Sequence, residues 1–388
     1  MTNVPTVEWP RAAARRLERH GLAAPAKDAG PADAVAAMCG AHAQLMSAAE
    51  LSVALRLKGT TRAGVREALW TARTLVKTYG PRGTVHLLPA RDLAMWTGAL
   101  SALPGVRNLH APGVRLTPEQ TDQVVEAVGD ALLEGELTVE ELGEAVTDRA
   151  GAWAGDLVVP AFGGMWPRWR QAMDVAANRG ALCFGPQRGR KVTYTNPHRL
   201  VPGFRPLGGT AALTALVEAY LRSYGPATAQ QFAQWTATPR PWATELFASL
   251  ESQGRVEPVD FLGQRAWLVA GDTAMPGAPP SGVRLLPYFD AFTVGCHPRE
   301  ALFPGRAAQR ALSGGQAGNF PVLIVDGEVA GVWHQRRSGQ KILLTVEPLN
   351  PLTPGQLREL DEQVERVGHI LEGRPELTIG TVTVGAHA

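Results

Sequence analysis

The sequence predicts an α+β fold of three tandem winged-helix units followed by a β-barrel-like C-terminal domain. Two observations lead to this fold. A capped helix, a second helix and a two-stranded hairpin occur in this order three times in series. From about residue 281, alternating or apolar runs separated by hairpin turns replace that pattern. The expected domains are residues 1–100, 101–205, 206–275 and 282–388.

The first unit begins at a capping box, Ser47-Ala48-Ala49-Glu50. In such a box the hydroxyl accepts a hydrogen bond from a free backbone N–H, and the glutamate bonds back to the cap. Apolar residues at helical spacing then predict a helix from Ser47 to about Leu57. A second helix is expected over 62–70, and strands over 74–78 and 83–88.

The second unit has two helix starts, Thr117 followed by Pro118, and the capping box that opens at Thr138. A further helix is predicted to carry Trp166, Trp169, Met173 and Ala176 on one side and to end at Gly180. Strands over 181–184 and 191–195 would complete the hairpin, with residues 185–190 at its tip.

The third unit begins at a cap on Thr228 and continues with a helix over about 242–253. Strands over 256–261 and 265–269 form its hairpin. Residues 270–281, rich in Gly and Pro, are expected to be a linker. In the C-terminal domain the sequence predicts a helix that begins after Thr353 and strands over residues 283–288, 320–325, 328–335, 341–347 and 377–384.

Charge and composition limit the classes of function. The 38 basic and 36 acidic residues give a net charge of +2, so any site for a polyanion must be a local patch. The three cysteines lie far apart in the sequence, which indicates a reducing compartment. No apolar run is long enough to cross a membrane, and the charged N-terminal residues are unlike a signal peptide. We expect a cytoplasmic monomer with no membrane contact.

A short polar insertion is the candidate for chemistry. No spacing of ligands typical of a metal site occurs, and no phosphate-binding loop or nucleophile elbow is present, so we expect neither a metal nor another cofactor. His42 and Gln44 flank Ala43 in an otherwise apolar stretch. On an extended segment, residues two apart point the same way, so both side chains could converge near a helix start. The alternative is that they only satisfy backbone groups at a helix junction.

Two basic hairpins are candidates for binding nucleic acid. The hairpin of the second unit, its wing, carries Arg188, Arg190 and Lys191. In the C-terminal domain, Arg336 and Arg337 precede a turn. Cationic side chains on a narrow hairpin suit phosphates or the minor groove. The alternative is that both turns are solvated and have no partner.

Four stretches resemble the winged-helix DNA glycosylases of the AlkZ and YcaQ type, bacterial enzymes that remove alkylated purines and unhook crosslinks. They are residues 40–57, 74–89, 221–235 with Tyr224-Gly225-Pro226, and 285–295 with Leu286-Pro287-Tyr288-Phe289-Asp290. The resemblance implies three winged helices that curve around DNA and a C-terminal β-barrel. It also implies that a Gln-hydrophobic-Gln motif in the first winged helix carries catalysis. The matching positions are His42, Ala43 and Gln44, so histidine replaces the first glutamine.

The resemblance therefore implies a monofunctional DNA glycosylase in DNA repair or antibiotic self-resistance, whose partner is double-stranded DNA carrying alkylated purines. Gln44 would position the water, and His42 would orient it or accept its proton. An alternative is a tandem winged-helix transcriptional regulator without catalysis. A regulator that recognises a specific DNA sequence would present arginine or amide side chains to base edges, whereas the helix over 242–253 contains no arginine. A third alternative, a protein that binds a free genotoxin, has no specific support in the sequence.

Overall fold

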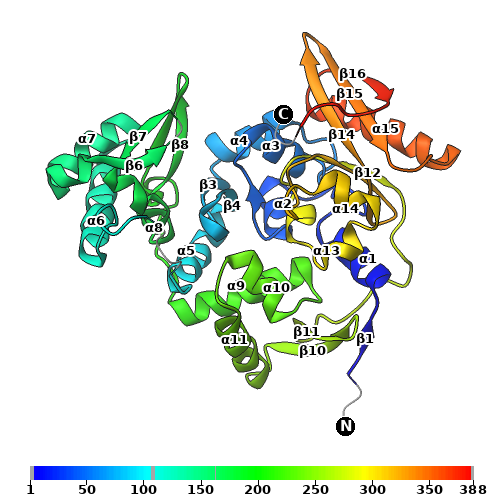
Figure 1. Cartoon of the computed structure of the whole chain (residues 1–388), viewed down its shortest axis with the longest axis horizontal. Coiled ribbons are helices and arrows are strands. Elements are labelled where there is room, and N and C mark those ends of the chain that lie inside the picture. Colours follow the sequence, from blue (N-terminus) through cyan, green and yellow to red (C-terminus); the bar gives the residue numbers. More distant parts are fainter. Residues whose placement is uncertain (1–3, 106–109, 162, 386–388) are drawn as a thin grey trace. The chain divides into compact units, whose positions relative to one another are not determined.

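A computed structural model describes residues 4–105, 110–161 and 163–385 (Figure 1). It is a mixed α+β structure in which the chain forms two compact units. The first unit contains residues 1–68, 217–235 and 240–388, and the second contains residues 69–216 and 236–239. The α+β class is confirmed. The boundaries of the four domains stay predictions.

The second unit contains a winged helix whose sheet has the order β5–β9–β8. The helices of the second unit are α5 (Leu93–Ala102), α6 (Pro118–Glu134), α7 (Val139–Ala150) and α8 (Met173–Asn178). Its strands are β3 (Leu75–Tyr79), β4 (Val85–Pro89), β5 (Leu137–Thr138), β6 (Leu157–Ala161), β7 (Gly164–Pro167), β8 (Cys183–Arg188) and β9 (Lys191–Thr195). The capping boxes predicted at Thr117 and Thr138 are confirmed, and each hydroxyl accepts the N–H three residues on. The buried faces of α6 and α7 pack around Trp169, which is 1% exposed.

The predicted helix through Trp166 is wrong at its start. Trp166 lies in β7, which pairs antiparallel with β6, and a 3₁₀ turn over Arg168–Ala172 precedes α8. The cause is Pro167, because the residue before a proline is driven from helical to extended backbone. The end of the helix is as predicted, since Gly180 adopts a φ of +76°. The wing is also longer than expected, because β8 continues to Arg188 and leaves Gly189 and Arg190 at the tip.

Since β3 and β4 lie in the second unit, the first unit contains the third winged-helix segment and the N-terminal segment without its predicted hairpin. Their elements are β1 (Thr6–Val7), α1 (Trp9–Arg19), α2 (Pro31–Ala37), β2 (Ala41–His42), α3 (Met46–Ala54), α4 (Arg62–Trp70), α9 (Gly209–Tyr224), α10 (Ala229–Thr236), α11 (Arg240–Ser252), β10 (Val256–Phe261) and β11 (Gln264–Val269). Of these, α4, α9 and α10 extend past the unit boundary. The third hairpin is joined by β1, which pairs parallel with β10. The predicted Thr228 cap is confirmed by its reciprocal bonds with Gln231.

Buried arginines of α1 connect distant segments of the first unit. Arg16 is 1% exposed, and it donates to the carbonyl oxygens of His297 at 2.6 Å and Pro226 at 2.8 Å. Its guanidinium also lies near the rings of Trp9 and Phe261. Charge-assisted bonds to carbonyls allow a guanidinium to be buried without a carboxylate.

The C-terminal part forms a curled five-stranded sheet, β12–β13–β14–β15–β16, whose last three strands are orange to red in Figure 1. Its elements are β12 (Val283–Leu286), α12 (Ala291–Gly295), α13 (Arg299–Leu302), α14 (Arg306–Ala311), β13 (Val322–Val325), β14 (Glu328–Ser338), β15 (Lys341–Pro348), α15 (Pro354–Ile370) and β16 (Arg374–Ile379). The last two strands are parallel because α15 crosses between them. This sheet confirms the barrel-like prediction. The last strand begins at Arg374 instead of at 377, and the three short helices α12 to α14 were not predicted.

Candidate active site

His42 and Gln44 lie in a short segment between helices α2 and α3. After α2, Cys39 and Gly40 both adopt positive φ values, of 53° and 92°, and turn the chain into β2. Ala41 and Ala43 are each 1% exposed, so one side of the segment is anchored in the core. His42 is 8% exposed and Gln44 is exposed. Residues 41–43 are buried and residues 44 and 45 are exposed, so the expectation that His42 and Gln44 share a face stays a prediction.

The end of α2 is held by two hydroxyl groups from the end of α9. Ser223 Oγ donates to the carbonyl oxygen of Ala37 at 2.8 Å, and Tyr224 Oη donates to that of Met38 at 2.8 Å. Burial raises the pKa of Tyr224 well above its usual value, so this phenol remains a hydrogen-bond donor at neutral pH. These bonds fix the carbonyls that lead directly into the turn before His42.

A glycine makes room for the Tyr224 ring. A Cβ atom on Gly295 would lie 2.2 Å from Tyr224 Cε1, which no side chain could tolerate without a shift of the ring. Gly295 ends α12, the helix that begins directly after Asp290. The stretches around Tyr224 and Asp290, both part of the family resemblance, are therefore packed against each other.

The helix that follows the segment is held by a buried ion pair. Arg56 and Asp290 are 1% and 0% exposed, and two bonds of 2.9 Å join the Arg56 guanidinium to the two Asp290 carboxylate oxygens. Ser52 Oγ on α3 donates to the same carboxylate at 2.7 Å. Burial raises the pKa of the Asp290 carboxyl, but the charge of Arg56 and the hydrogen bonds from Arg56, Ser52 and the Phe292 N–H outweigh burial and hold it below its ordinary value. Both ends of the segment are thus fixed by residues distant in sequence.

The predicted cap at Ser47 is wrong. The N-cap of α3 is Leu45, which has no side-chain capping bond, and Ser47 lies inside the helix. Glu50 instead forms a bidentate ion pair with Arg66 of α4, with bonds of 2.7 Å and 3.0 Å. Because Glu50 is 2% exposed, its carboxylate requires a cationic partner, and that requirement takes precedence over a local cap.

The structure places the second-wing cations beside acidic residues of α7. Arg188 Nη1 contacts both carboxylate oxygens of Glu141, at 2.7 Å and 3.0 Å, and Arg188 Nη2 donates to the carbonyl oxygen of Glu136. Lys191 lies 3.3 Å from Glu140. For Arg190, by contrast, we find no ion pair within the described part of the chain. Nothing tests whether these residues bind DNA, so their role stays a prediction.

The two C-terminal cations also differ. Arg337 donates to the carbonyl oxygens of Leu371 and Glu372, just beyond α15, and so stabilises the end of that helix. Arg336 is exposed on β14, and no side-chain partner for it is found among residues that the structure describes. Of the five predicted DNA-binding residues, Arg190 and Arg336 are therefore the two for which no ion pair or carbonyl contact is found among the described residues.

Two residues near the site were missed by the sequence reasoning as functional positions. Asp290 was noted only as part of a family stretch, and Tyr224 likewise. The signal available was a polar residue close to glycine or proline in each stretch, as in Tyr224-Gly225-Pro226, but contacts across more than 180 positions are not encoded in local patterns. In the described ranges, no three His, Cys, Asp or Glu side chains gather where they could hold a metal ion, and no helix could span a membrane.

The comparisons with known proteins agree with one another. A family model described as "DNA glycosylase AlkZ-like" matches residues 35–370. An "Interstrand DNA cross-link repair glycosylase" of Streptomyces sahachiroi is 32% identical over 344 residues, which cover 84% of this chain and 87% of the relative. A solved structure, the DNA glycosylase AlkZ of Streptomyces sahachiroi, is 26% identical, has a TM-score of 0.79, and matches over 97% of this chain and 100% of its own.

Proposed function

Because the chain belongs to the AlkZ-like DNA glycosylase family, we propose that it hydrolyses the N-glycosidic bond of alkylated purines in duplex DNA. The proposed lesions are N7-alkylguanine, bulky genotoxin adducts and interstrand crosslinks, in DNA repair or self-resistance. The name of the curated relative, a crosslink repair glycosylase, supports this choice of lesion. The comparisons favour a glycosylase over a transcriptional regulator.

The chemistry requires little of the protein. An N7-alkylated guanine is already cationic, so its glycosidic bond is weakened and protonation of the leaving base is unnecessary. What remains is to stabilise an oxocarbenium-like sugar and to hold a water behind C1′. We propose that Gln44 positions this water and that His42 orients it or accepts its proton.

The observation that carries the proposal is how firmly the 41–44 segment is held. Its backbone is fixed by positive φ values at Cys39 and Gly40 and by the buried alanines at 41 and 43. Hydrogen bonds from Tyr224 to the end of α2 and from Ser52 of α3 to Asp290 hold the two neighbouring helices. Gln44 is exposed to solvent. If its only role were to bond to backbone groups at the helix junction, its side-chain amide would not need to be exposed. Preorganised placement is what a site needs when it acts by positioning.

We also propose that the enzyme is monofunctional. A strand-cleaving lyase would need an amine to form a Schiff base, and no lysine occurs between Lys27 and Lys58 in the sequence. The expected products are a free base and an intact abasic strand. Action as a cytoplasmic monomer without cofactor stays part of this proposal.

Excision of N7-methylguanine from alkylated duplex DNA, measured in single turnover, tests the function. Gln44→Ala should lower the rate by roughly two to four orders of magnitude, with DNA affinity little changed. His42→Gln restores the usual family motif and should retain activity. Ser47→Ala is the matched control, because Ser47 is exposed nearby and has no proposed role. Wild-type rates in both Gln44→Ala and His42→Ala would show that the motif is only structural.

A further inference from the structure

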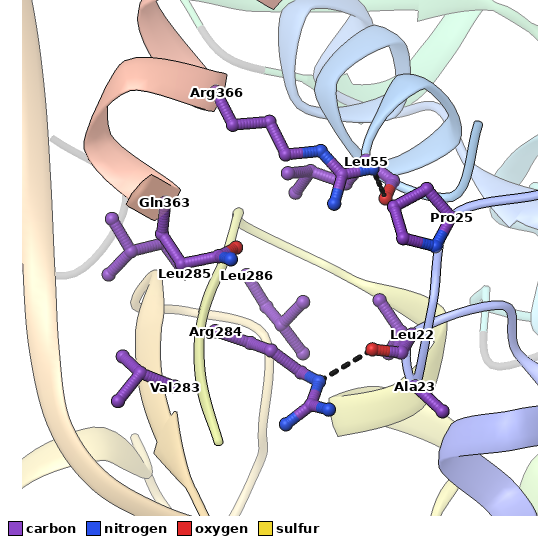
Figure 2. Close-up of a pocket in the computed structure, with 10 residues that line it drawn as sticks. All are labelled: Leu22, Ala23, Pro25, Leu55, Val283, Arg284, Leu285, Leu286, Gln363 and Arg366. Carbon is purple, nitrogen blue, oxygen red and sulfur yellow. Dashed lines mark hydrogen bonds between the residues drawn. The ribbon is translucent and has the colours of Figure 1, made fainter. Parts of the chain in front are cut away.

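A small cavity in the first unit is lined by two arginines from different elements (Figure 2). Its volume is about 90 Å³. Arg284 lies on β12 and Arg366 on α15, and Gln363 is one turn before Arg366 on the same helix face. The remaining lining residues are apolar: Leu22, Ala23, Pro25, Leu55, Val283, Leu285 and Leu286.

Both arginines are bonded to carbonyl oxygens and have no ion-paired carboxylate within the described ranges. Arg284 donates to Leu22 O at 2.6 Å and, through Nη1, to the carbonyls of Ser281 and Gly282. Glu359 and Asp326 raise the pKa of Arg284 only through longer-range attraction, and burial outweighs them. Arg366 donates Nη2 to Leu55 O, the C-cap of α3.

Arg366 thus has a carbonyl partner but no carboxylate partner within the described ranges. Burial and the neighbouring Arg56 lower the pKa of Arg366 to about 10, so it stays protonated at neutral pH. Arg56 is itself neutralised by Asp290. An anion in the cavity would offset the remaining positive charge.

The bonds to carbonyls leave several donors unused. Arg284 has Nη2, Arg366 has Nε and Nη1, and Gln363 has its side-chain amide. These donor atoms are not fully buried. Capping of α3 explains one N–H of Arg366, but it does not explain why a second guanidinium and an amide line the same cavity.

We propose that this cavity binds a phosphate group. Guanidinium groups match the tetrahedral oxygens of phosphate in paired N–H···O bonds. The apolar walls limit the occupant to a small group. The phosphate is either a backbone phosphate of bound DNA or that of a free phosphate-bearing molecule.

Inorganic phosphate is the probe, added to the full-length protein and compared with chloride at equal ionic strength. Phosphate at a concentration of ten times its dissociation constant should raise the midpoint temperature of unfolding by about 2 °C. Calorimetric titration should show that Arg366→Gln weakens phosphate binding about 10-fold or more, as expected for loss of a charge-assisted pair. Arg358→Gln, on an exposed face of the same helix, is the matched control and should bind as the wild type does.

Binding of duplex DNA, measured at several salt concentrations, distinguishes the two sources of phosphate. If the phosphate belongs to DNA, Arg366→Gln should reduce the log–log salt slope of duplex binding by about 0.9, while Arg358→Gln leaves it unchanged. If the source is a free molecule, the slope stays the same while phosphate binding is still lost.

Gln363→Met removes the amide with little change in volume and serves if Arg366→Gln does not fold. It should also weaken phosphate binding, because a donor is removed. The proposal is overturned if phosphate stabilises the wild type no more than chloride does, or if phosphate stabilises the variants of Arg366 and Gln363 as much as the wild type.

Discussion

His20 is a completely buried histidine whose ring nitrogens have no well-formed hydrogen bond in the described part of the chain, although the backbone of Ser223 is a polar neighbour of the ring. Its ring packs edge-on against Tyr224 and Phe292, with centroid distances of 5.0 Å and 5.7 Å. Burial, and after it the positive charge of Arg56, lower its pKa to about 3. His20 is thus neutral in the folded protein and serves as an aromatic packing residue beside the Arg56–Asp290 pair.

This histidine should make the protein sensitive to mild acid. The unfolded chain protonates a histidine near pH 6.5, but the folded chain does so only near pH 3, so the unfolded state binds more protons in between. The free energy of unfolding should fall by about 1.4 kcal/mol for each pH unit below about 6.5. His86, whose pKa burial lowers to about 4, should add a similar loss in the second unit.

His20→Phe keeps an aromatic ring and removes the titrating group. Unfolding midpoints at pH 7, 6 and 5 should therefore decrease less in this variant than in the wild type. His369→Phe, at an exposed position of α15, is the control and should leave the pH dependence unchanged. An equally steep pH dependence in His20→Phe would show that His20 is not the acid-sensitive group.

At the scale of elements, the bonds that hold α2 and α3 connect the candidate catalytic segment to two distant stretches. Tyr224 fixes the carbonyl of Met38, and Asp290 binds Ser52 and Arg56. A positioning effect should depend on these bonds, because a misplacement of about 1 Å can cost about 100-fold in rate. Both residues would act through the 41–44 segment and not on the substrate.

Tyr224→Phe tests this positioning with a minimal change. It keeps the ring against Gly295 and removes only the O–H that bonds to Met38. We expect the single-turnover excision rate to fall about 10- to 100-fold and the free energy of unfolding by about 1 kcal/mol, with DNA affinity retained. Tyr220→Phe, also buried on α9, is the matched control. A wild-type excision rate in Tyr224→Phe would remove this residue from the positioning of the motif.

Local patterns predicted many elements but not the contacts that hold them. The caps at Thr117, Thr138 and Thr228 were found because every atom involved lies within four residues. The same pattern failed at Ser47 because Glu50 is buried against Arg66, a contact that depends on the packing of two helices. For the segment of His42 and Gln44, the sequence predicted position and alternation. The clamps through Tyr224 and Asp290 depend on the folded chain.

At the scale of the whole molecule, a chain of net charge +2 must hold DNA through local patches. If all five hairpin cations met phosphates, counterion release would give a log–log salt slope near −4 to −5, at about −0.9 per contact. The structure changes that expectation. Arg188 and Lys191 already face Glu141 and Glu140, and Arg337 is engaged at the end of α15.

Arg190 and Arg188 therefore offer a matched pair for measuring the wing's contribution. A cation that contacts a DNA phosphate displaces a condensed counterion, whereas a cation kept in its protein ion pair does not. Arg190→Ala should reduce the salt slope of duplex binding by about 0.9. Arg188→Ala should weaken binding, because Glu141 loses its partner, but should change the slope by less.

Excision from fully bound substrate should be nearly unchanged in both variants, since neither residue is proposed to touch the sugar or the water. Equal slopes for the wild type and Arg190→Ala would remove this wing from the interface. A variant that binds normally yet fails to excise would instead place the wing at the lesion itself.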